Sequence, residues 1–323
     1  MAPTALPGIG QMAVAAAQNP ASADRAKRAG EKHTGLLLLL PALTIMTVVG
    51  LFPLIHSLYI SLTGYKPVDP DKFQGFVGLR NYIRALTDGQ FWHSMGLTAA
   101  FTALSVAASL VLAVLLALLF NQRLRGFLAI RTLILVPMLI TPIAVGITWR
   151  IMMMPDLGVL NYLLGLVGIP SQPWAGSKSG ALASMLLVDV WQWTPFMFII
   201  IFAGISALPK SPFESAAIDG ASPVQTFFWV TLPMLKPVIV IACLLRIVDA
   251  MRTYDTVYII TRGGPDFATD LISVNLQRAN FRNFDLGYGS AMSWLTLVAI
   301  LAVVLIFVKL TGFMKLVAEK ENR

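Results

Sequence analysis

Six long apolar stretches restrict this chain more than any other feature of its sequence. The hydrocarbon core of a bilayer is about 30 Å thick, so a helix that crosses it needs about 20 predominantly apolar residues. The segments that meet this requirement are Leu36–Leu62, Phe91–Phe120, Phe127–Met154, Ala181–Leu208, Pro237–Ile260 and Tyr288–Phe313. We therefore predict an all-α integral membrane protein with six transmembrane helices.

Composition agrees with a location in the lipid bilayer. Of the 323 residues, 57% are hydrophobic and 12% are charged, whereas a soluble domain has about one quarter charged residues. The net charge of +8 does not predict a nucleic-acid partner, because many of the charged residues flank the apolar stretches.

The distribution of basic residues predicts the orientation of the chain. Positive charges are enriched in cytoplasmic loops. With the amino terminus inside, six crossings leave both termini in the cytoplasm. The cytoplasmic segments then contain Arg25, Lys27, Arg28, Lys32, Arg123, Arg125, Arg131, Lys210, Lys236, Lys309, Lys315, Lys320 and Arg323. The opposite loops mix both signs, so they either meet a periplasmic partner or form ordinary solvated surface.

Four segments follow from this pattern. Residues 1–33 are rich in Ala, Pro, Ser and Gln, so we expect a disordered cytoplasmic tail. It does not resemble a secretory signal, because its basic cluster follows the weakly apolar part. Residues 34–90 hold the first transmembrane helix and a periplasmic segment, 91–315 the main transmembrane domain with a cytoplasmic loop at 208–233, and 316–323 a second cytoplasmic tail.

The sequence lacks the residue patterns that metal binding, disulfide formation and ATP hydrolysis require. Cys243 is the only cysteine, and His33, His56 and His93 lie far apart without neighbours at metal-ligand spacing. The phosphate-binding pattern G-x-x-x-x-G-K-[ST] does not occur. We therefore expect no metal site, no catalytic residues, no cofactor bound by this chain and no ATPase site of its own.

The loop between the fourth and fifth apolar stretches contains two helix-start patterns. Ser211 followed by Glu214 has the spacing of a capping box, and Pro212 suits the first helical position. Gly220 then predicts a helix end. The second pattern consists of Ser222, Pro223 and Gln225.

These patterns predict two short helices on the cytoplasmic face. The first would expose the small residues Ser215, Ala216 and Ala217, which allow close approach of another protein. The second would pack its aromatic residues Phe227, Phe228 and Trp229 against the transmembrane helices. An interfacial helix lying on lipid headgroups is the alternative interpretation.

The loop resembles a known motif. Glu214, Ser215, Ala216, Asp219, Gly220 and Ala221, followed by Leu232 and Pro233, are similar to the E-A-A-x-x-D-G-A…L-P loop of permeases in binding-protein-dependent ABC importers. Ser215 departs from the motif but stays small. Segments similar to the carbohydrate branch of that family are FVGLRNY at Phe76–Tyr82, WRIMMMPDLGVLN at Trp149–Asn161, WQWTPF at Trp191–Phe196 and YDTVYIITRGGP at Tyr254–Pro265.

This resemblance implies a MetI-like permease core in a bacterial inner membrane. It implies that the loop is a coupling helix docked on an ATPase, with Glu214 as a polar contact and Gly220 as the turn. Ser215, Ala216, Ala217 and Asp219 would complete the docking surface. The implied partners are a second permease, a periplasmic solute-binding protein and two ATPase subunits, which bind ATP and Mg.

The fifth apolar stretch contains four charged residues. Arg246, Asp249, Arg252 and Asp255 are three residues apart, a spacing at which helical neighbours meet. Isolated charges at mid-bilayer cost about 2.5–3.5 kcal/mol each, so we expect pairs or a wet cavity. Either the charges join this helix to its neighbours, or Arg246, Asp249 and Thr253 line a solute path, and both roles are compatible.

The fourth stretch adds a second polar group. Asp189 lies close to Gln192, Trp193 and Phe196, and Pro195 frees a backbone carbonyl. Aromatic rings beside polar groups suit a sugar, although a Trp near a membrane boundary is often a headgroup anchor. The resemblance to maltose-type permeases implies that Asp189, Gln192, Trp193, Phe196, Arg246, Asp249 and Thr253 lie on the solute path.

Together these observations predict a permease subunit of an ATP-driven importer for a sugar, oligosaccharide, polyol or sugar derivative. An ion-coupled secondary transporter using the Arg/Asp series is the alternative. Its inverted repeats would give interrupted apolar segments in corresponding positions of two halves, and the sequence has none that we recognise. Arg246 and Arg252 leave an anionic sugar derivative open as the solute.

Overall fold

The computed structural model describes residues 38–68, 74–121 and 127–313. It divides into one unit that ends at Tyr59 and another that begins at Ile60. Both predicted tails, 1–33 and 316–323, fall outside the described residues. Several basic residues that we predicted to be cytoplasmic also lie outside the described residues: Arg25, Lys27, Arg28, Lys32, Arg123, Arg125, Lys315, Lys320 and Arg323.

The first unit is an apolar helix. Residues Leu38–Ser61 run as one helical stretch, which includes the π-helical turn η1 (Met46–Leu51) and α3 (Phe52–Ser61). Nearly all its side chains up to Tyr59 are exposed and apolar. A helix that is apolar on every side is suited to a bilayer rather than to water.

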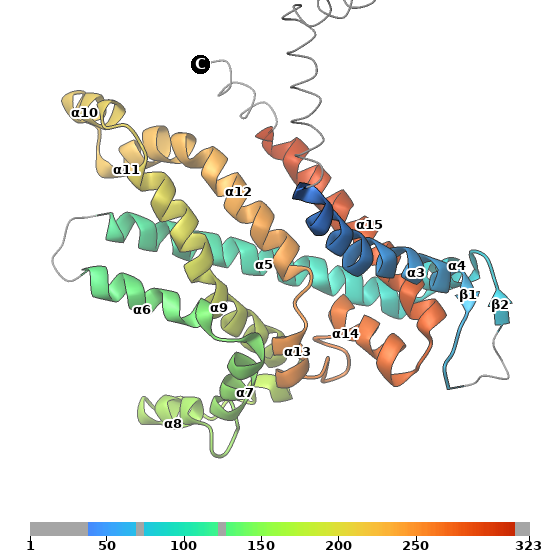
Figure 1. Ribbon diagram of the computed structural model, residues 1–323. Helices are drawn as coiled ribbons and strands as arrows, with labels where there is room; N and C mark the ends of the chain where they lie inside the picture. Colours follow the sequence, from blue (N-terminus) through green and yellow to red (C-terminus); the bar gives the residue numbers. More distant parts are fainter. Residues whose placement is uncertain (1–37, 69–73, 122–126, 314–323) are drawn as a thin grey trace, which may run out of the picture. The chain divides into compact units, whose positions relative to one another are not determined.

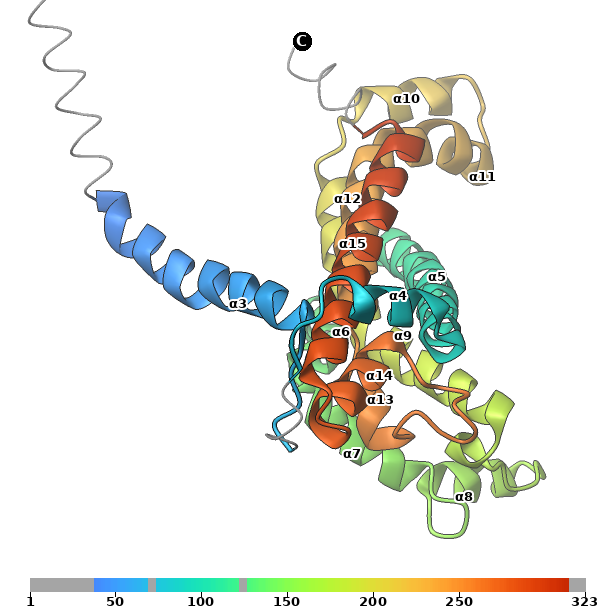
Figure 2. The ribbon, with the colours of Figure 1, turned by 90° about the vertical axis from the view of Figure 1, so that its right-hand side faces the viewer.

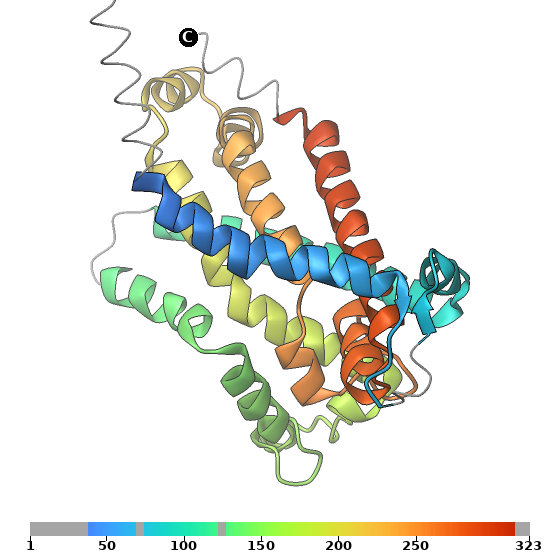
Figure 3. The same cartoon turned by 45° about the vertical axis from the view of Figure 1, so that its right-hand side comes forward.

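Four long helices build the second unit. They are α5 (Gly89–Phe120), α9 (Lys178–Ser206), α15 (Leu286–Thr311) and a continuous helix, Pro223–Ala250, that ends in α12 (Leu232–Ala250). α5 lies along α9, and α12 packs against both of them and against α15 (Figures 1 and 3). The small residues Ala113 and Ala117 of α5 are fully buried, which allows close packing of membrane helices.

Shorter elements lie at the ends of this bundle. α10 and α11 are at one end, whereas α7, α8 and α13 are at the other (Figures 1 and 2). The shorter elements are β1 (Thr63–Gly64), β2 (Gln74–Phe76), α4 (Arg80–Thr87), α6 (Phe127–Leu139), α7 (Pro142–Met152), α8 (Val159–Leu166), η3 (Trp174–Gly176), α10 (Ser211–Ile218), α11 (Pro223–Thr226), η4 (Phe227–Thr231), α13 (Asp255–Ile260), α14 (Ile272–Gln277) and η5 (Arg278–Arg282). β1 and β2 pair in antiparallel fashion.

The third predicted span is bent rather than straight. α6 and α7 meet at an angle of 99°. Thr141 is extended because Pro142 follows it, and the residue before a proline disfavours the helical conformation. Two neighbouring helices satisfy the backbone at this bend: Gln192 Nε2 donates to Ile140 O at 3.1 Å, and Thr256 Oγ1 donates to Pro142 O at 3.4 Å. By length and composition the described chain therefore has five candidate spans, or six when this pair counts as one.

The fifth predicted span, Pro237–Ile260, has different bounds. Its helix begins earlier, at Pro223, and ends at Ala250, and α13 starts separately at Asp255. Arg252 and Asp255 therefore do not share one helix, and our expectation of an i,i+3 pair between them is wrong. Within the described part of the chain these two residues form no ion pair.

Polar contacts organise the end of the bundle opposite α10. Asn81 of α4 donates to Ser61 O at 2.9 Å and to Thr63 O at 2.8 Å. Asp285 precedes α15 and accepts from Arg84 at 2.9 Å and from Lys66 at 3.1 Å. Burial by itself raises the pKa of the Asp285 carboxyl, but the hydrogen bonds and charges of Arg84 and Lys66 outweigh it and hold this pKa below its usual value.

Candidate functional site

The loop 208–233 begins with α10, whose start differs from the prediction. Lys210 is the N-cap residue and makes no side-chain cap, and Ser211 is the first helical residue. The capping box predicted for Ser211 and Glu214 is therefore wrong. Lys210 already has helical backbone angles (φ −78°, ψ −30°), so the helical turn begins one residue earlier than the pattern suggests.

The predicted stop at Gly220 is confirmed. Gly220 has a φ of +73°, which a residue without a Cβ adopts at little cost. Its N–H donates to Ala217 O at 3.2 Å, and the N–H of Ala221 donates to Ala216 O at 2.9 Å. These two bonds form a Schellman motif, which satisfies the last carbonyl groups of α10.

The second capping box is also confirmed, but the helix that it starts is not short. Gln225 N donates to Ser222 Oγ at 3.3 Å, and Ser222 N donates to Gln225 Oε1 at 2.8 Å. From Pro223 the chain passes through α11 and η4 into α12 without ending. The predicted separate second helix is therefore the first part of the fifth span.

Exposure on this loop differs in part from the prediction. Glu214, Ser215, Ala217, Asp219 and Gly220 are exposed as expected. Ala216 is buried, because it lies on the face of α10 that turns toward the rest of the chain.

The aromatic residues of the loop do not pack against the spans as predicted. Phe228 is exposed and Trp229 is 81% exposed, while Phe227 is half-buried. Ile218, at the end of α10, is 86% exposed. We did not predict an exposed position for Ile218. The large apolar side chain directly before Asp219 and Gly220 could have indicated a contact surface.

Near the other end of the long helix, Arg246 forms a buried polar cluster. Its side chain is fully buried, and Nη2 donates to Asp189 of α9 and to Ser105 Oγ of α5, the latter at 2.9 Å. Ser105 also donates to Asp189. Nη1 donates to Asp249 Oδ2 at 3.1 Å, so the predicted Arg246–Asp249 pair is confirmed. The cluster joins three transmembrane helices.

Ser105 is a member of the cluster that the sequence analysis missed. It belongs to a row of buried hydroxyl residues on α5, at positions where helical spacing returns the side chain to one face. The row consists of Ser94, Thr98, Thr102, Ser105 and Ser109. The spacing of three or four residues between these hydroxyl residues is visible in the sequence and could have predicted a polar helix face.

A cavity of about 180 Å³ lies beside this cluster, where the bend between α6 and α7 meets the break after α12. It is lined by Pro142, Trp193, Asp249, Arg252, Thr253, Tyr254, Asp255 and Thr256. Three predicted solute-path residues, Trp193, Asp249 and Thr253, are therefore brought together. The side chain of Asp249 is 37% exposed here, and its ion pair with the buried Arg246 holds it in place.

The other predicted solute-path residues are not in this cavity. Asp189, Gln192 and Arg246 are buried between helices, where they bind each other or the backbone. Phe196 packs against the apolar core of α5, α9 and α12, and its ring meets that of Trp193 edge to face at 6.4 Å. Arg252, Tyr254, Asp255 and Thr256 line the cavity but were not proposed as site residues.

The cavity has the groups needed to bind a polar solute without covalent chemistry. Asp249 and Asp255 provide acceptors, Arg252 provides donors, and the threonine and tyrosine hydroxyls provide both. In the described segments no group of three or more His, Cys, Asp or Glu side chains is placed to hold a metal ion.

Comparisons with known proteins identify the family. A profile described as "Binding-protein-dependent transport system inner membrane component" matches residues 109–323. The trehalose/maltose transport system permease protein MalF of Thermococcus litoralis is 38% identical over 284 residues, which are 88% of this chain and 95% of that protein. The trehalose transport system permease protein SugA of Mycobacterium tuberculosis is 33% identical over 285 residues, which are 88% of this chain and 91% of that protein.

The fold is also found in a solved structure. A chain of the bacterial ABC transporter involved in the import of the acidic polysaccharide alginate superposes with a TM-score of 0.77, covering 90% of this chain and 98% of that one. The identity is 19%, so this likeness concerns the fold alone.

These findings confirm the predicted permease fold and membrane location, and they do not favour the ion-coupled secondary transporter. The chain belongs to the family of inner-membrane components of binding-protein-dependent transport systems, and it is a multi-pass permease of this ABC importer family.

Proposed function

We propose that this chain is a permease subunit of an ATP-driven importer for a carbohydrate: a sugar, an oligosaccharide, a polyol or a sugar derivative. It forms the translocation path with a second permease and receives its solute from a periplasmic binding protein. Two separate ATPase subunits bind ATP and Mg and hydrolyse the nucleotide, and this chain acts mechanically. The substrates named for the two relatives, trehalose and maltose, support the carbohydrate class.

One observation carries the mechanical part of the proposal. The helix Pro223–Ala250 is continuous over 28 residues, a length of about 42 Å at 1.5 Å per residue. It begins beside the Gly220 turn and holds Arg246 and Asp249 near its other end. A displacement of the turn is therefore transmitted to the polar cavity through one continuous helix.

The ATPase docks on the exposed face of α10 and on the turn after it. Glu214, Ser215, Ala217, Asp219 and Gly220 are exposed there, and the small size of Ser215, Ala217 and Gly220 permits close contact. Ala216 is not part of this face. Its buried side chain packs α10 against the rest of the chain.

The solute passes the cavity beside Asp249. Its lining offers the ring of Trp193 to an apolar sugar face, and carboxylate and hydroxyl groups to sugar hydroxyls. Arg246 positions the Asp249 carboxylate, and Asp189 and Gln192 hold α9 and the bend at Ile140 in place. Phe196 supports Trp193. Only Trp193, Asp249 and Thr253 of the predicted set face the solute directly in this scheme.

In the membrane, both termini and the α10 end face the cytoplasm. Lys210 and Lys309 lie at the ends of spans on this side, in agreement with the positive-inside rule. The opposite end, with α4, α8 and α13, then faces the binding protein.

Transport by the assembled importer in proteoliposomes tests the energy source and the solute class. We expect uptake of a radiolabelled disaccharide to require ATP and to be unaffected by ionophores that collapse ion gradients. Uptake that continues without ATP and stops with the ionophore would refute the ATP-driven mechanism.

Two substitutions test the docking face. Glu214→Lys reverses an exposed charge, and Gly220→Val cannot adopt a φ of +73° without strain. Both should abolish ATP-dependent uptake while the protein still inserts and assembles with the second permease. Glu214→Asp, which keeps the charge, and Gly220→Asn, which tolerates a positive φ, are the matched controls and should retain uptake. Normal uptake by Glu214→Lys and Gly220→Val would exclude this face as the docking site.

A further inference from the structure

A cavity of about 740 Å³ lies at the α10 end of the bundle, away from the solute path. Its walls come from the last turns of α5 and α9, from α6 and from the beginning of α10. The lining includes Arg131, Phe202, Lys210, Phe213 and Glu214. Because α5 ends at Phe120 and α9 ends at Ser206, the cavity lies at the depth where spans emerge from the hydrocarbon.

A second cavity of about 520 Å³ adjoins the first. The two share Leu118, Phe213, Ala217 and Thr231, so they lie next to each other. Most residues that line the second cavity are apolar, and they include Phe227 and Pro223. Taken together, the two adjoining cavities have a charged part and an apolar part, which matches an amphiphile better than a small ion.

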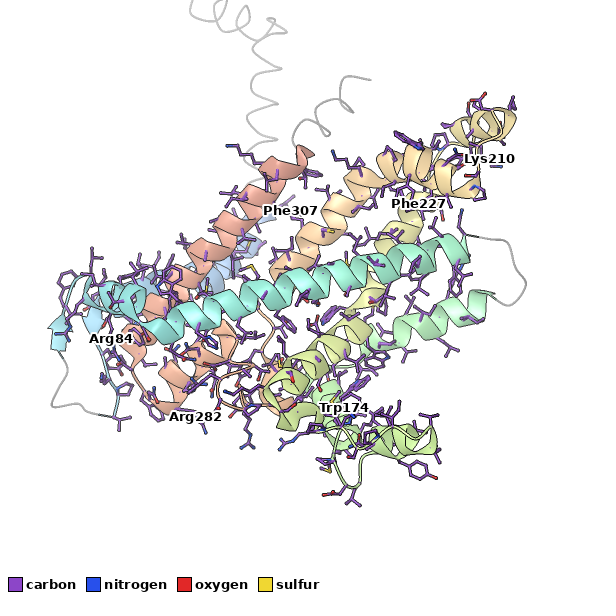
Figure 4. The ribbon with its side chains drawn as sticks, turned by 180° about the vertical axis from the view of Figure 1, so that it is seen from behind. Arg84, Trp174, Lys210, Phe227, Arg282 and Phe307 are labelled. Carbon is purple, nitrogen blue, oxygen red and sulfur yellow. The ribbon has the colours of Figure 1, made fainter. Side chains whose placement is uncertain are left out.

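The charged part favours an anion. The ionisable side chains that line it, among the described residues, are Arg131, Lys210 and Glu214, with a sum of +1. Lys210 is exposed and forms no ion pair with any described residue. Figure 4 shows Lys210 where the chain enters α10.

Arg131 is held in place before any ligand binds. It donates to Phe120 O, the last carbonyl of α5, and its guanidinium carbon lies 4.3 Å from the centre of the Phe202 ring. Its Nε is buried without a hydrogen-bond partner in the described segments. A guanidinium fixed at the wall of a cavity is suited to a phosphate group.

We propose that this space binds an anionic phospholipid of the leaflet on the α10 side. Arg131 and Lys210 take up the phosphate, and an acyl chain follows the adjoining apolar cavity. Basic pockets between transmembrane helices on the cytoplasmic side are favourable sites for lipid headgroups. A bound lipid would fill the space between α10 and the ends of α5 and α9, and would thereby support α10. Glu214 and Ala217 line this space and also belong to the proposed docking face of α10, so a bound lipid would lie next to the docked ATPase.

Native mass spectrometry of the assembled importer in detergent tests the proposal. The probes are phosphatidylglycerol and phosphatidylcholine with identical acyl chains, and excess inorganic phosphate as a competitor. Each cation near an anionic lipid contributes about fivefold in affinity. We therefore expect phosphatidylglycerol to be retained, and Lys210→Gln to weaken its binding about fivefold. Lys210→Arg should restore it.

The control variant is Lys236→Gln, which removes an exposed positive charge from the same end of the bundle but outside both cavities. It should retain phosphatidylglycerol like the wild type. Arg131→Gln should also weaken binding, but it removes the contact with Phe120, so Lys210→Gln is the decisive variant.

Four results would overturn the proposal. They are equal retention of both lipids, equal weakening by Lys210→Gln and Lys236→Gln, displacement of the lipid by inorganic phosphate, and the absence of any lipid in the wild-type importer. Displacement by phosphate would identify a free anion as the ligand. Absence of lipid would show that the space takes up no phospholipid in the assembly.

Discussion

Removal of Arg246 should destabilise the transmembrane bundle more than any substitution in the solute cavity. Arg246→Met keeps an unbranched apolar stem but removes the cation that binds Asp189 and Asp249. Breaking one partner of a buried ion pair costs about 3–5 kcal/mol. The part that concerns Asp249 is small, below about 1 kcal/mol, because this carboxylate is 37% exposed and screened by solvent.

Most of the effect therefore comes from leaving Asp189 buried without its cation. A loss of about 4 kcal/mol corresponds to a fall of about 10 °C in the Tm of a unit of this size. The measurement is thermal unfolding of the detergent-purified importer, followed by intrinsic fluorescence. Asp249→Asn is the control, and it should lower the Tm by less than about 3 °C.

A double substitution separates the ion pair from other effects. Arg246→Met combined with Asp189→Leu replaces both partners with apolar groups, which is often neutral for stability. The double variant should therefore recover most of the loss. A Tm of Arg246→Met within about 2 °C of the wild type, or a double variant as unstable as the single one, would refute the reasoning.

Three further predictions concern other parts of the chain. Ser222→Ala removes the capping box at the start of the long helix and should cost about 1 kcal/mol in chemical unfolding, and an unchanged midpoint would contradict the cap. Gly204→Ala places a Cβ at 2.8 Å from Val238 Cγ1 and should cost about 1–3 kcal/mol, whereas Gly165→Ala, which meets nothing within 4 Å, should be neutral or slightly stabilising. Asp285 has a folded-state pKa below its usual value, so its stabilising contribution is present above about pH 4 and is lost as the pH falls toward the folded-state pKa. Asp285→Asn should flatten the acid limb of a stability profile between about pH 5 and pH 3, and an unchanged acid limb would contradict this assignment.

Local signals in the sequence predicted much of the permease correctly. Apolar length predicted the spans, because a membrane helix must meet the bilayer along its whole length. The capping box at Ser222 and the stop at Gly220 are also local, since each involves residues within a few positions. The Arg246–Asp249 pair could be predicted for the same reason.

The errors arose where neighbouring helices compete with local preference. The capping pattern at Ser211 is not used, and the aromatic residues after Thr226 continue a long helix instead of ending a short one. At the Thr141 bend, which Pro142 favours locally, the side chains that satisfy the backbone, Gln192 and Thr256, come from other helices. These partners are distant from the bend in the sequence, so no local pattern could have predicted them.

The sequence by itself determined a multi-span membrane protein and the family motif of its loop, because apolar length, caps and turns depend on near neighbours along the chain. Only the tertiary structure decided which predicted polar residues face a cavity. It separated Trp193, Asp249 and Thr253, which line the cavity, from Asp189, Gln192 and Arg246, which are buried. The physical reason is that a buried charge must find its partner on whichever helix packs against it. Ser105 of α5 and Asp189 of α9 meet Arg246 through packing over 141 and 57 residues of separation.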